Sequence, residues 1–214
     1  PGEDGEGRSL RWEVPETESA DEFFLLTAGR DNAAKIWHCR VAEDDSVEGR
    51  AIARFDWGTA GERARMGHTR PINSARFFVA GQRILAVTAS DDGSAKIWNQ
   101  NEQTARWEVL HSFVDEQHPA ASLHAAVVSP NGKWLATASN GRVSVWEMPQ
   151  EGQVASKEPI QRLDLEDATA LCLAFSRDCR WLAAGGTDFL GRIWDLEPLA
   201  GEKPVEQTAA LPLV

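Results

Sequence analysis

Short runs of apolar and β-branched residues recur along this chain, and a few polar residues separate each run from the next. Runs such as 84–88 and 134–137 have the length of a strand. Asp, Asn, Gly and Ser follow them, and these residues are typical of tight turns. An apolar pair that ends in Trp comes after each turn. The pattern predicts β-hairpins, and no stretch shows the periodicity of a convincing helix.

The hairpin pattern occurs four times, at residues 26–37, 87–98, 136–146 and 183–194, and each copy ends in Trp. Another candidate strand precedes each hairpin, at 10–14, 72–78, 123–128 and 171–175. A fourth candidate strand follows each Trp, at 51–55, 105–110, 160–165 and 206–211. Four strands in each of four units predict an all-β repeat array.

These units resemble the WD-repeat (WD40) family of β-propellers, in which each blade is a four-stranded antiparallel sheet. The resemblance rests on the Gly67-His68 dipeptide, the Phe that ends a first strand in two units, the Ser-Pro-Asn-Gly turn at 129–132, and the Trp194-Asp195 pair. It extends from Arg8 to Leu211 and implies propeller blades.

The strand pattern also places boundaries between the predicted blades. They are a linker at 1–7, blade 1 at 8–56, an insertion loop at 57–66, blade 2 at 67–112, blade 3 at 113–165 and blade 4 at 166–214. Rings of this family close with about seven or eight blades, at about 40–45 residues each. We therefore expect another chain or a missing segment to complete the ring. Pairing of two copies is the second alternative, and an unusual four-bladed ring is the third.

Composition narrows the class of protein. The chain has 214 residues, 42% of them hydrophobic, which is enough for a buried core. Its net charge of −11 repels phosphate backbones and anionic lipids, so we expect neither nucleic acid nor membrane as a partner.

The three cysteines are odd in number and form no CxxC pair, which favours reduced thiols and a cytoplasmic location. We expect Cys172 to be buried. The start at Pro1 instead of Met favours a segment of a longer protein.

The recurring Trp has a structural explanation. The chain holds nine Trp and no Tyr, and an indole joins a large apolar body to one N–H that needs a buried acceptor. The family resemblance implies a buried hydrogen-bonded chain of His68, Ser90, Asp92 and Trp98 in the second unit. These side chains also resemble a catalytic triad, but they recur with Trp at repeat spacing and no G-x-S-x-G turn accompanies them. We therefore predict that the chain of hydrogen bonds is structural.

The sequence predicts no catalytic residues, no metal, no cofactor and no enzymatic activity, because phosphate-binding Gly loops, H-E-x-x-H and kinase signatures are missing. The resemblance implies a protein-interaction scaffold or sensor module, in a narrower version part of a multidomain signalling protein. In the family, the loops before the first strand and between the second and third strands form one face. The partner-binding residues implied there are Arg30, Asn32, Thr69, Arg70, Asp91, Phe189 and Leu190.

Two further hypotheses concern Trp57 as an interface residue and His124 as a metal ligand. Trp57 lies in the insertion loop near Arg63 and Arg65, and an exposed Trp beside Arg is typical of protein interfaces, although Trp57 could equally pack under its own loop. The alternative function is a hydrolase or lactonase with a metal in the central channel. His124 would be its first ligand, but it stands alone, and such a metal site needs at least about three protein ligands.

Overall fold

The computed structural model describes residues 21–55, 67–150, 152–197, 199, 205 and 207–212. These residues contain thirteen strands and no α-helix, which confirms the predicted all-β class for this part of the chain. The expected strand at 10–14, the linker at 1–7 and the insertion loop with Trp57 lie outside the described residues.

The first two sheets are antiparallel and follow the chain in order. The first sheet contains β1 (Glu22–Ala28), β2 (Ala34–Val41) and β3 (Val47–Phe55). The second contains β4 (Ile72–Ala80), β5 (Arg83–Ser90), β6 (Ser94–Gln100) and β7 (Trp107–Val114). The second sheet thus has the four strands expected of a blade, and its last strand extends beyond residue 112, where the sequence placed the end of blade 2.

The third and fourth units share one six-stranded sheet. Its strands are β8 (Leu123–Val128), β9 (Trp134–Glu147), β10 (Gln161–Phe175), β11 (Trp181–Gly186), β12 (Leu190–Asp195) and β13 (Gln207–Pro212). The first part of β10 pairs with β9 and its second part pairs with β11, with a shift of register between Asp164 and Thr169. One long strand therefore ends the third unit and begins the fourth.

Strand β9 contains the whole hairpin of the third unit. The Trp146 Nε1 group donates a hydrogen bond of 3.0 Å to the Thr137 hydroxyl. In a straight strand, residues nine positions apart lie about 30 Å from each other, so β9 doubles back on itself. The bend lies at Asn140-Gly141, where Gly141 has a φ of +71°. This turn is one residue shorter than the turn of the second unit, and the strand continues through it.

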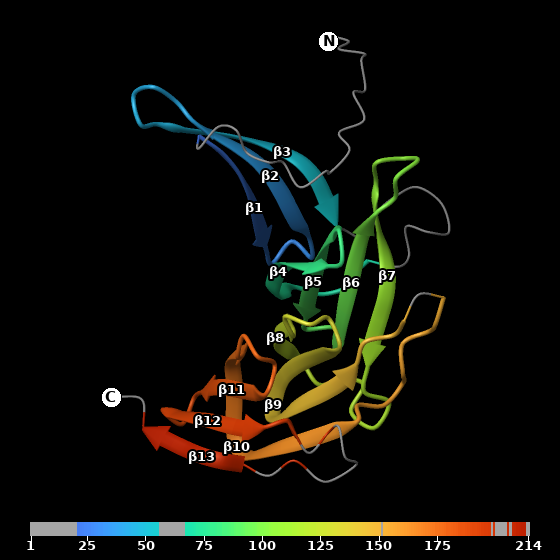
Figure 1. The fold of residues 1–214 in the computed structure, drawn as a ribbon, viewed down its shortest axis with the longest axis vertical. Helices are drawn as coiled ribbons and strands as arrows, with labels where there is room; N and C mark the ends of the chain where they lie inside the picture. The colour runs from blue at the N-terminus through green and yellow to red at the C-terminus, as the bar shows by residue number, and fades with distance from the viewer. Residues whose placement is uncertain are drawn as a thin grey trace.

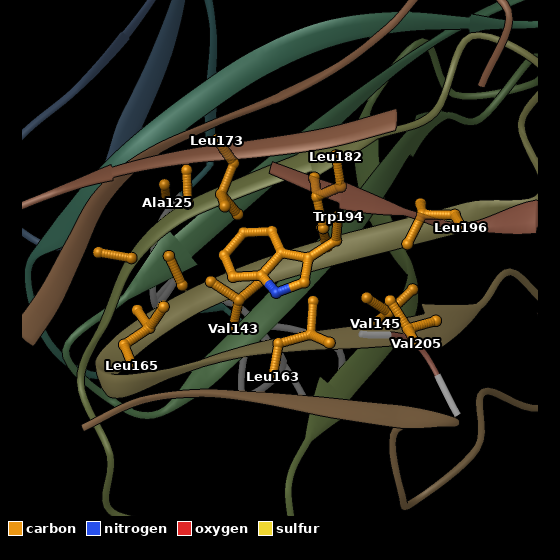
Figure 2. Packing of buried hydrophobic residues seen from close by; sticks show 14 of the residues in the cluster. Ala125, Val143, Val145, Leu163, Leu165, Leu173, Leu182, Trp194, Leu196 and Val205 are labelled. Carbon is orange, nitrogen blue, oxygen red and sulfur yellow. The ribbon is translucent and has the colours of Figure 1, made fainter. Parts of the chain in front are cut away.

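Three apolar clusters lie between neighbouring units, and each receives the Trp of the later unit. Trp98 stacks on Phe55 of the first sheet, with ring centroids 4.9 Å apart. Trp146 meets Phe113 of the second sheet edge to face at 5.6 Å. Figure 2 shows the Trp194 indole in the middle of the third cluster, surrounded by aliphatic side chains of the third and fourth units. Burial of these rings joins each unit to the one before it.

The sheets follow one another along an open arc, with the blue strands β1–β3 at one end and the red strand β13 at the other (Figure 1). Within the residues that the structure describes, no further sheet packs against either end. Ile97 and Val145, which precede the Trp of their units, are fully buried, whereas Ile193 at the same position of the last unit is only partly buried. At the opposite end Trp37 is also only partly buried.

The expectation that Cys172 is buried is wrong. Its neighbour Leu173 belongs to the apolar cluster between the third and fourth units, and side chains alternate along a strand. Cys172 therefore points to the other face of the last sheet, and its side chain is exposed because no further sheet covers that face among the described residues. Cys39 is buried and Cys179 is partly exposed.

Candidate functional site

The residues proposed as a partner-binding face lie in turns at one edge of the sheets. Arg30 and Asn32 occupy the turn between β1 and β2, and Thr69 and Arg70 precede β4. Asp91 lies in the turn between β5 and β6. The side chains of Arg30, Thr69 and Arg70 are exposed, and those of Asn32 and Asp91 are partly buried.

Hydrogen bonds join these turns across neighbouring sheets. The Asn32 side-chain amide donates to the Thr69 carbonyl at 3.3 Å, and the Ile72 amide donates to the Gly29 carbonyl at 3.1 Å. Asn32 has a φ of +61°, a left-handed conformation that Asn tolerates better than most residues. The turn of the first sheet and the loop before β4 therefore form one surface.

A second set of contacts continues this surface to the third unit. The Asn73 side-chain amide donates to Asp91 Oδ1 at 2.6 Å and to the Leu123 carbonyl at 2.9 Å. The Asn73 amide on β4 thus binds the Asp91 carboxylate of its own sheet and also a backbone carbonyl on β8, the first strand of the next sheet. Asn73 was not among the proposed face residues, although the structure gives it the central position in these contacts.

Phe189 and Leu190 are separate from this group. Phe189 lies in the turn between β11 and β12, and Leu190 is the first residue of β12, in the last unit of the arc. Phe189 is 74% exposed and has a φ of +62°, which a bulky aromatic residue rarely adopts. Within the described residues, neither side chain has a hydrogen bond or ring contact to the other proposed face residues. The structure thus brings five of the predicted residues together and leaves these two at a distance along the arc.

Below the face, a chain of hydrogen bonds crosses the second sheet. The Trp98 Nε1 group donates to the Thr88 hydroxyl at 2.8 Å, and the same hydroxyl lies 2.7 Å from His68 Nε2. His68 Nδ1 lies 3.0 Å from Asp92 Oδ2. Because the carboxylate can only accept, the ring proton belongs on Nδ1, and Nε2 accepts from Thr88. His68 and Thr88 are completely buried.

Thr88 takes the place that the sequence analysis gave to Ser90. The Ser90 hydroxyl instead donates to the Arg70 carbonyl at 3.1 Å and accepts from the Asp92 amide at 3.1 Å. Residues 88 and 90 point to the same face of their strand, so the sequence of one unit does not distinguish their hydroxyls. The repeats do, because Thr27 and Thr137 accept from the Trp of their units at 2.9 and 3.0 Å.

The Asp92 carboxylate accepts several hydrogen bonds. Besides His68 it accepts from the Thr69 amide at 2.9 Å and from the Ser94 hydroxyl at 2.6 Å. Burial alone would raise the pKa of Asp92, but these hydrogen bonds outweigh burial and hold the pKa well below its usual value. Burial lowers the pKa of His68, and the hydrogen bond to Asp92 opposes this only in part. The imidazole is therefore neutral at pH 7.

A cavity of about 270 Å³, which the sequence analysis did not identify, lies beside the turn of β9. It is bordered by the end of the second sheet, by the loop before β8 and by β9 and β10. Its polar lining residues are Asp115, His118, Thr137, Ser139, Asn140, Arg142, Ser144, Asp164 and Glu166. Trp146 and Phe113 contribute its apolar part.

His124 does not belong to a group of potential metal ligands. Its Nε2 atom lies 2.8 Å from the Asn140 side-chain oxygen. In the part of the chain that the structure describes, no three His, Cys, Asp or Glu side chains converge on one point. None of the described segments forms a long apolar helix of the kind that crosses a bilayer.

Comparisons with known proteins agree with the repeat pattern. The sequence model of the family described as "WD domain, G-beta repeat" matches residues 61–99, 107–147 and 157–195. The chain is 25% identical over 176 residues to the small ribosomal subunit protein RACK1 of Neurospora crassa, covering 79% of this chain and 46% of that protein. It is 24% identical over 128 residues to the target of rapamycin complex subunit LST8-1 of Arabidopsis thaliana, covering 60% and 38%.

A third relative is the MST50-interacting protein 11 of Pyricularia oryzae, 24% identical over 176 residues, which cover 79% of this chain and 46% of that protein. The matched part of this chain thus spans less than half the length of each of these three relatives. The three segments matched by the family model correspond to the second, third and fourth units of the structure, and the first unit lies outside them.

Proposed function

Since this chain belongs to the WD-repeat family, we propose that it is a non-catalytic scaffold that binds other proteins through its turn face. The turn face consists of Arg30, Asn32, Thr69, Arg70 and Asp91. The observation that carries the proposal is the hydrogen bonding of these turns across the first two sheets, from the Asn32 side chain to the Thr69 carbonyl and from the Ile72 amide to the Gly29 carbonyl. Such contacts hold the backbone of the turns in place before a partner binds, which lowers the entropic cost of association.

The names of the relatives support the proposal. One is a ribosomal subunit protein, one is a subunit of a complex, and one is named for its interaction with another protein. Each name describes a protein that works in contact with others. The proposal includes a cytoplasmic location and a role within a larger signalling protein, and the acidic net charge of −11 supports partners other than nucleic acid or membrane.

We also propose that a further propeller segment completes the ring. Ile193 and Trp37 are only partly buried at the two ends of the arc, whereas the equivalent side chains inside the arc are buried. The relatives are more than twice as long as the part that this chain matches, which is the length that additional blades would need. The fourth repeat, in the first unit, is part of this proposal, since its Trp37 bonds to Thr27 as in the matched units.

The turn face is tested by charge reversal. The Arg30→Glu/Arg70→Glu double variant alters two exposed side chains of the face, so it leaves the fold intact. As a matched control, Arg83→Glu/Arg177→Glu changes two exposed arginines at the opposite edge of the sheets. Each immobilised protein is incubated with extract of the cells that express it, and retained proteins are quantified by mass spectrometry.

We expect the turn-face variant to lose about tenfold or more of at least one partner that the unchanged chain and the control variant retain. Equal retention by all three proteins would contradict the proposed face. Melting temperatures of the three proteins, measured in parallel, show that a loss of binding does not come from unfolding.

A further inference from the structure

The cavity beside the turn of β9 occupies the place that an imidazole fills in the second unit. There, His68 is held between the Thr88 hydroxyl and Asp92, with its ring 6.2 Å from that of Trp98. The equivalent Thr137 and Trp146 line the cavity of the third unit. The third unit therefore has the same floor, but its lining histidine, His118, lies 2.8 Å from Arg142 Nη1 and forms no hydrogen bond with Thr137.

Two sequence differences open this space. His68 lies four residues before the first strand of its unit, and Pro119 has that position before β8. The Pro119 carbonyl lies against Gly93 of the second sheet, where an added Cβ would approach it to 2.4 Å. The loop thus lies against Gly93 at the border of the cavity, and Pro119 places no imidazole over Thr137. Ser144 replaces the long side chain of Lys96, which lies two residues before the Trp of its unit.

Two hydroxyl groups on the floor of the cavity can form further hydrogen bonds. Ser144 is 6% exposed, and its hydroxyl forms no hydrogen bond within the described residues. Thr137 is 2% exposed and accepts from Trp146, but no imidazole accepts from it as one does from Thr88. Both residues line the cavity, so a polar group that enters it can pair with their hydroxyls. The floor of the cavity is therefore suited to a polar group.

The mouth of the cavity is acidic. Asp115, Asp164 and Glu166 line it together with Arg142 and His118. Asp115 pairs with Arg162 at 2.8 Å and Asp164 pairs with Arg142 at 3.2 Å, whereas Glu166 is exposed and forms no ion pair within the described residues. The one carboxylate left over, that of Glu166, favours a cation over an anion or a neutral group.

The size of the cavity limits what can enter. Pockets that hold drug-sized ligands start at about 300 Å³. A volume of about 270 Å³ is below this range and suits one side chain. We propose that this cavity receives a basic side chain, Arg or Lys, from a polypeptide bound to the scaffold. Its N–H groups would donate to the hydroxyls of Ser144 and Thr137 and to the carboxylates at the mouth. The proposal rests on the proposed scaffold function and specifies the chemistry of the partner.

The test uses three tripeptides blocked at both ends, Gly-Arg-Gly, Gly-Lys-Gly and Gly-Gln-Gly, titrated into the full chain with backbone amide NMR as readout. We expect saturable shifts at residues 139–144 with at least one basic peptide, and binding of the Gln peptide weaker by about tenfold or more. Equal shifts with the Gln peptide, shifts only elsewhere, or no saturation with either basic peptide would overturn the proposal.

Variants locate the site within the chain. Ser144→Lys inserts the residue that the second unit carries at this position, so it fills the cavity with a cation and should weaken peptide binding by about tenfold or more. Ser156→Lys adds the same charge at an exposed position away from the cavity and should leave binding unchanged. Unweakened binding to a folded Ser144→Lys protein would contradict the assignment.

Removal of the carboxylates gives a second test that does not disturb the core, since Asp164 is 74% exposed and Glu166 is also exposed. The Asp164→Asn/Glu166→Gln variant should bind the basic peptide several-fold more weakly, and unchanged binding would contradict the proposal even if Ser144→Lys did not fold. The peptide titration does not depend on the turn face. If the basic peptides do not bind but the extract experiment shows loss of a partner from the turn-face variant, the cavity proposal is rejected and the scaffold proposal still holds.

Discussion

At the scale of the residue, the second unit depends on satisfying every group in a buried chain. Thr88 links the indole of Trp98 to the imidazole of His68, and Asp92 completes the chain at its other end. An indole N–H or an imidazole nitrogen that is buried here without a partner loses its hydrogen bond to water and forms none within the protein. The loss of one link should therefore destabilise the fold more than the loss of a surface contact.

The two hydroxyls near this chain should differ in importance. We expect Thr88→Val, which keeps the shape of the side chain, to lower the free energy of unfolding by about 3 kcal/mol, because two buried partners lose their hydrogen bonds. Ser90→Ala should cost about 1 kcal/mol, because water can reach the backbone groups that it releases in the turn. Urea denaturation of both variants measures the difference. A larger loss for Ser90→Ala would reassign the central link to Ser90.

The carboxylates of two equivalent turns provide a second comparison. Asp92→Ala should cost about 2 kcal/mol, since the side chain is 10% exposed and accepts from His68, Ser94 and a backbone amide. Asp31 is 49% exposed and forms two exposed ion pairs, with Lys35 at 3.6 Å and with Arg54 at 3.9 Å, so Asp31→Ala should cost less than about 0.5 kcal/mol. Equal shifts of the denaturation midpoint would show that the first unit contains an equally important network.

Stability should fall on acidification because of His68. Its pKa is lowered by burial, so below about pH 6.5 the unfolded chain binds a proton that the folded chain does not. The free energy of unfolding should decline from pH 7 to pH 5, by at most about 1.4 kcal/mol per pH unit for this group. Asp92, whose pKa is lowered, adds a further loss below about pH 4.

Denaturation curves at several pH values test this. Burial also lowers the pKa of His111, so the unchanged chain contains both contributions. We expect His68→Gln to be less stable at pH 7 but to show a smaller slope between pH 7 and pH 5. An identical slope in the variant would mean that His68 does not carry the effect.

At the scale of the element, tight turns decide how the strands are connected. The shorter turn at Gly141 lets β9 run through its hairpin, and β10 passes from the third unit to the fourth without interruption. In the second unit, Gly93 with a φ of +81° closes the turn between β5 and β6 and lies against the loop before β8. This glycine therefore has both a conformational and a packing role.

Two glycine replacements separate these roles. Gly81 has a φ of +63° with open space around it, so Gly81→Ala should cost only about 1 kcal/mol of conformational strain. An added Cβ at Gly93 would lie 2.4 Å from the Pro119 carbonyl, so Gly93→Ala should cost at least about 2 kcal/mol. Thermal unfolding of the two variants provides the comparison. A cost at Gly93 no greater than that at Gly81 would show that the loop moves away freely.

At the scale of the whole molecule, the two ends of the arc are less covered than its interior among the described residues. Trp98, Trp146 and Trp194 are buried against the preceding unit, whereas Trp37 has no preceding unit in this part of the chain and is only partly buried. Apolar faces of this kind are typical of interfaces. Their covering by a further segment would turn the arc into the ring that the family resemblance implies.

The rate at which the Cys172 thiol is modified measures whether this end of the arc is covered. In dilute solution we expect maleimide to modify the exposed Cys172 at least about tenfold faster than the buried Cys39. Sedimentation measures the mass under the same conditions. If copies of the chain pair through this face at higher concentration, the mass should increase while Cys172 becomes protected. Protection of Cys172 in a monomer would contradict the open face.

The amino-acid sequence by itself determined the strands, the turns and the repeat. These features depend on neighbouring residues, because alternation, turn-forming residues and the Trp that ends each hairpin act over a few positions. The predicted strand at 123–128 is therefore observed without change as β8. The WD-repeat family could also be recognised, since His68, Asp92 and the recurring Trp stand at fixed positions within a unit.

Only the tertiary structure decided which hydroxyl binds Trp98, why Cys172 is exposed, and where the cavity of the third unit lies. Each of these depends on contacts between segments far apart in the chain. Thr88 and Ser90 are equivalent along one strand and differ only in what faces them from β6 and from the loop before β4. The exposure of a side chain depends in the same way on whether another sheet packs against it, and the sequence of one unit does not contain that information.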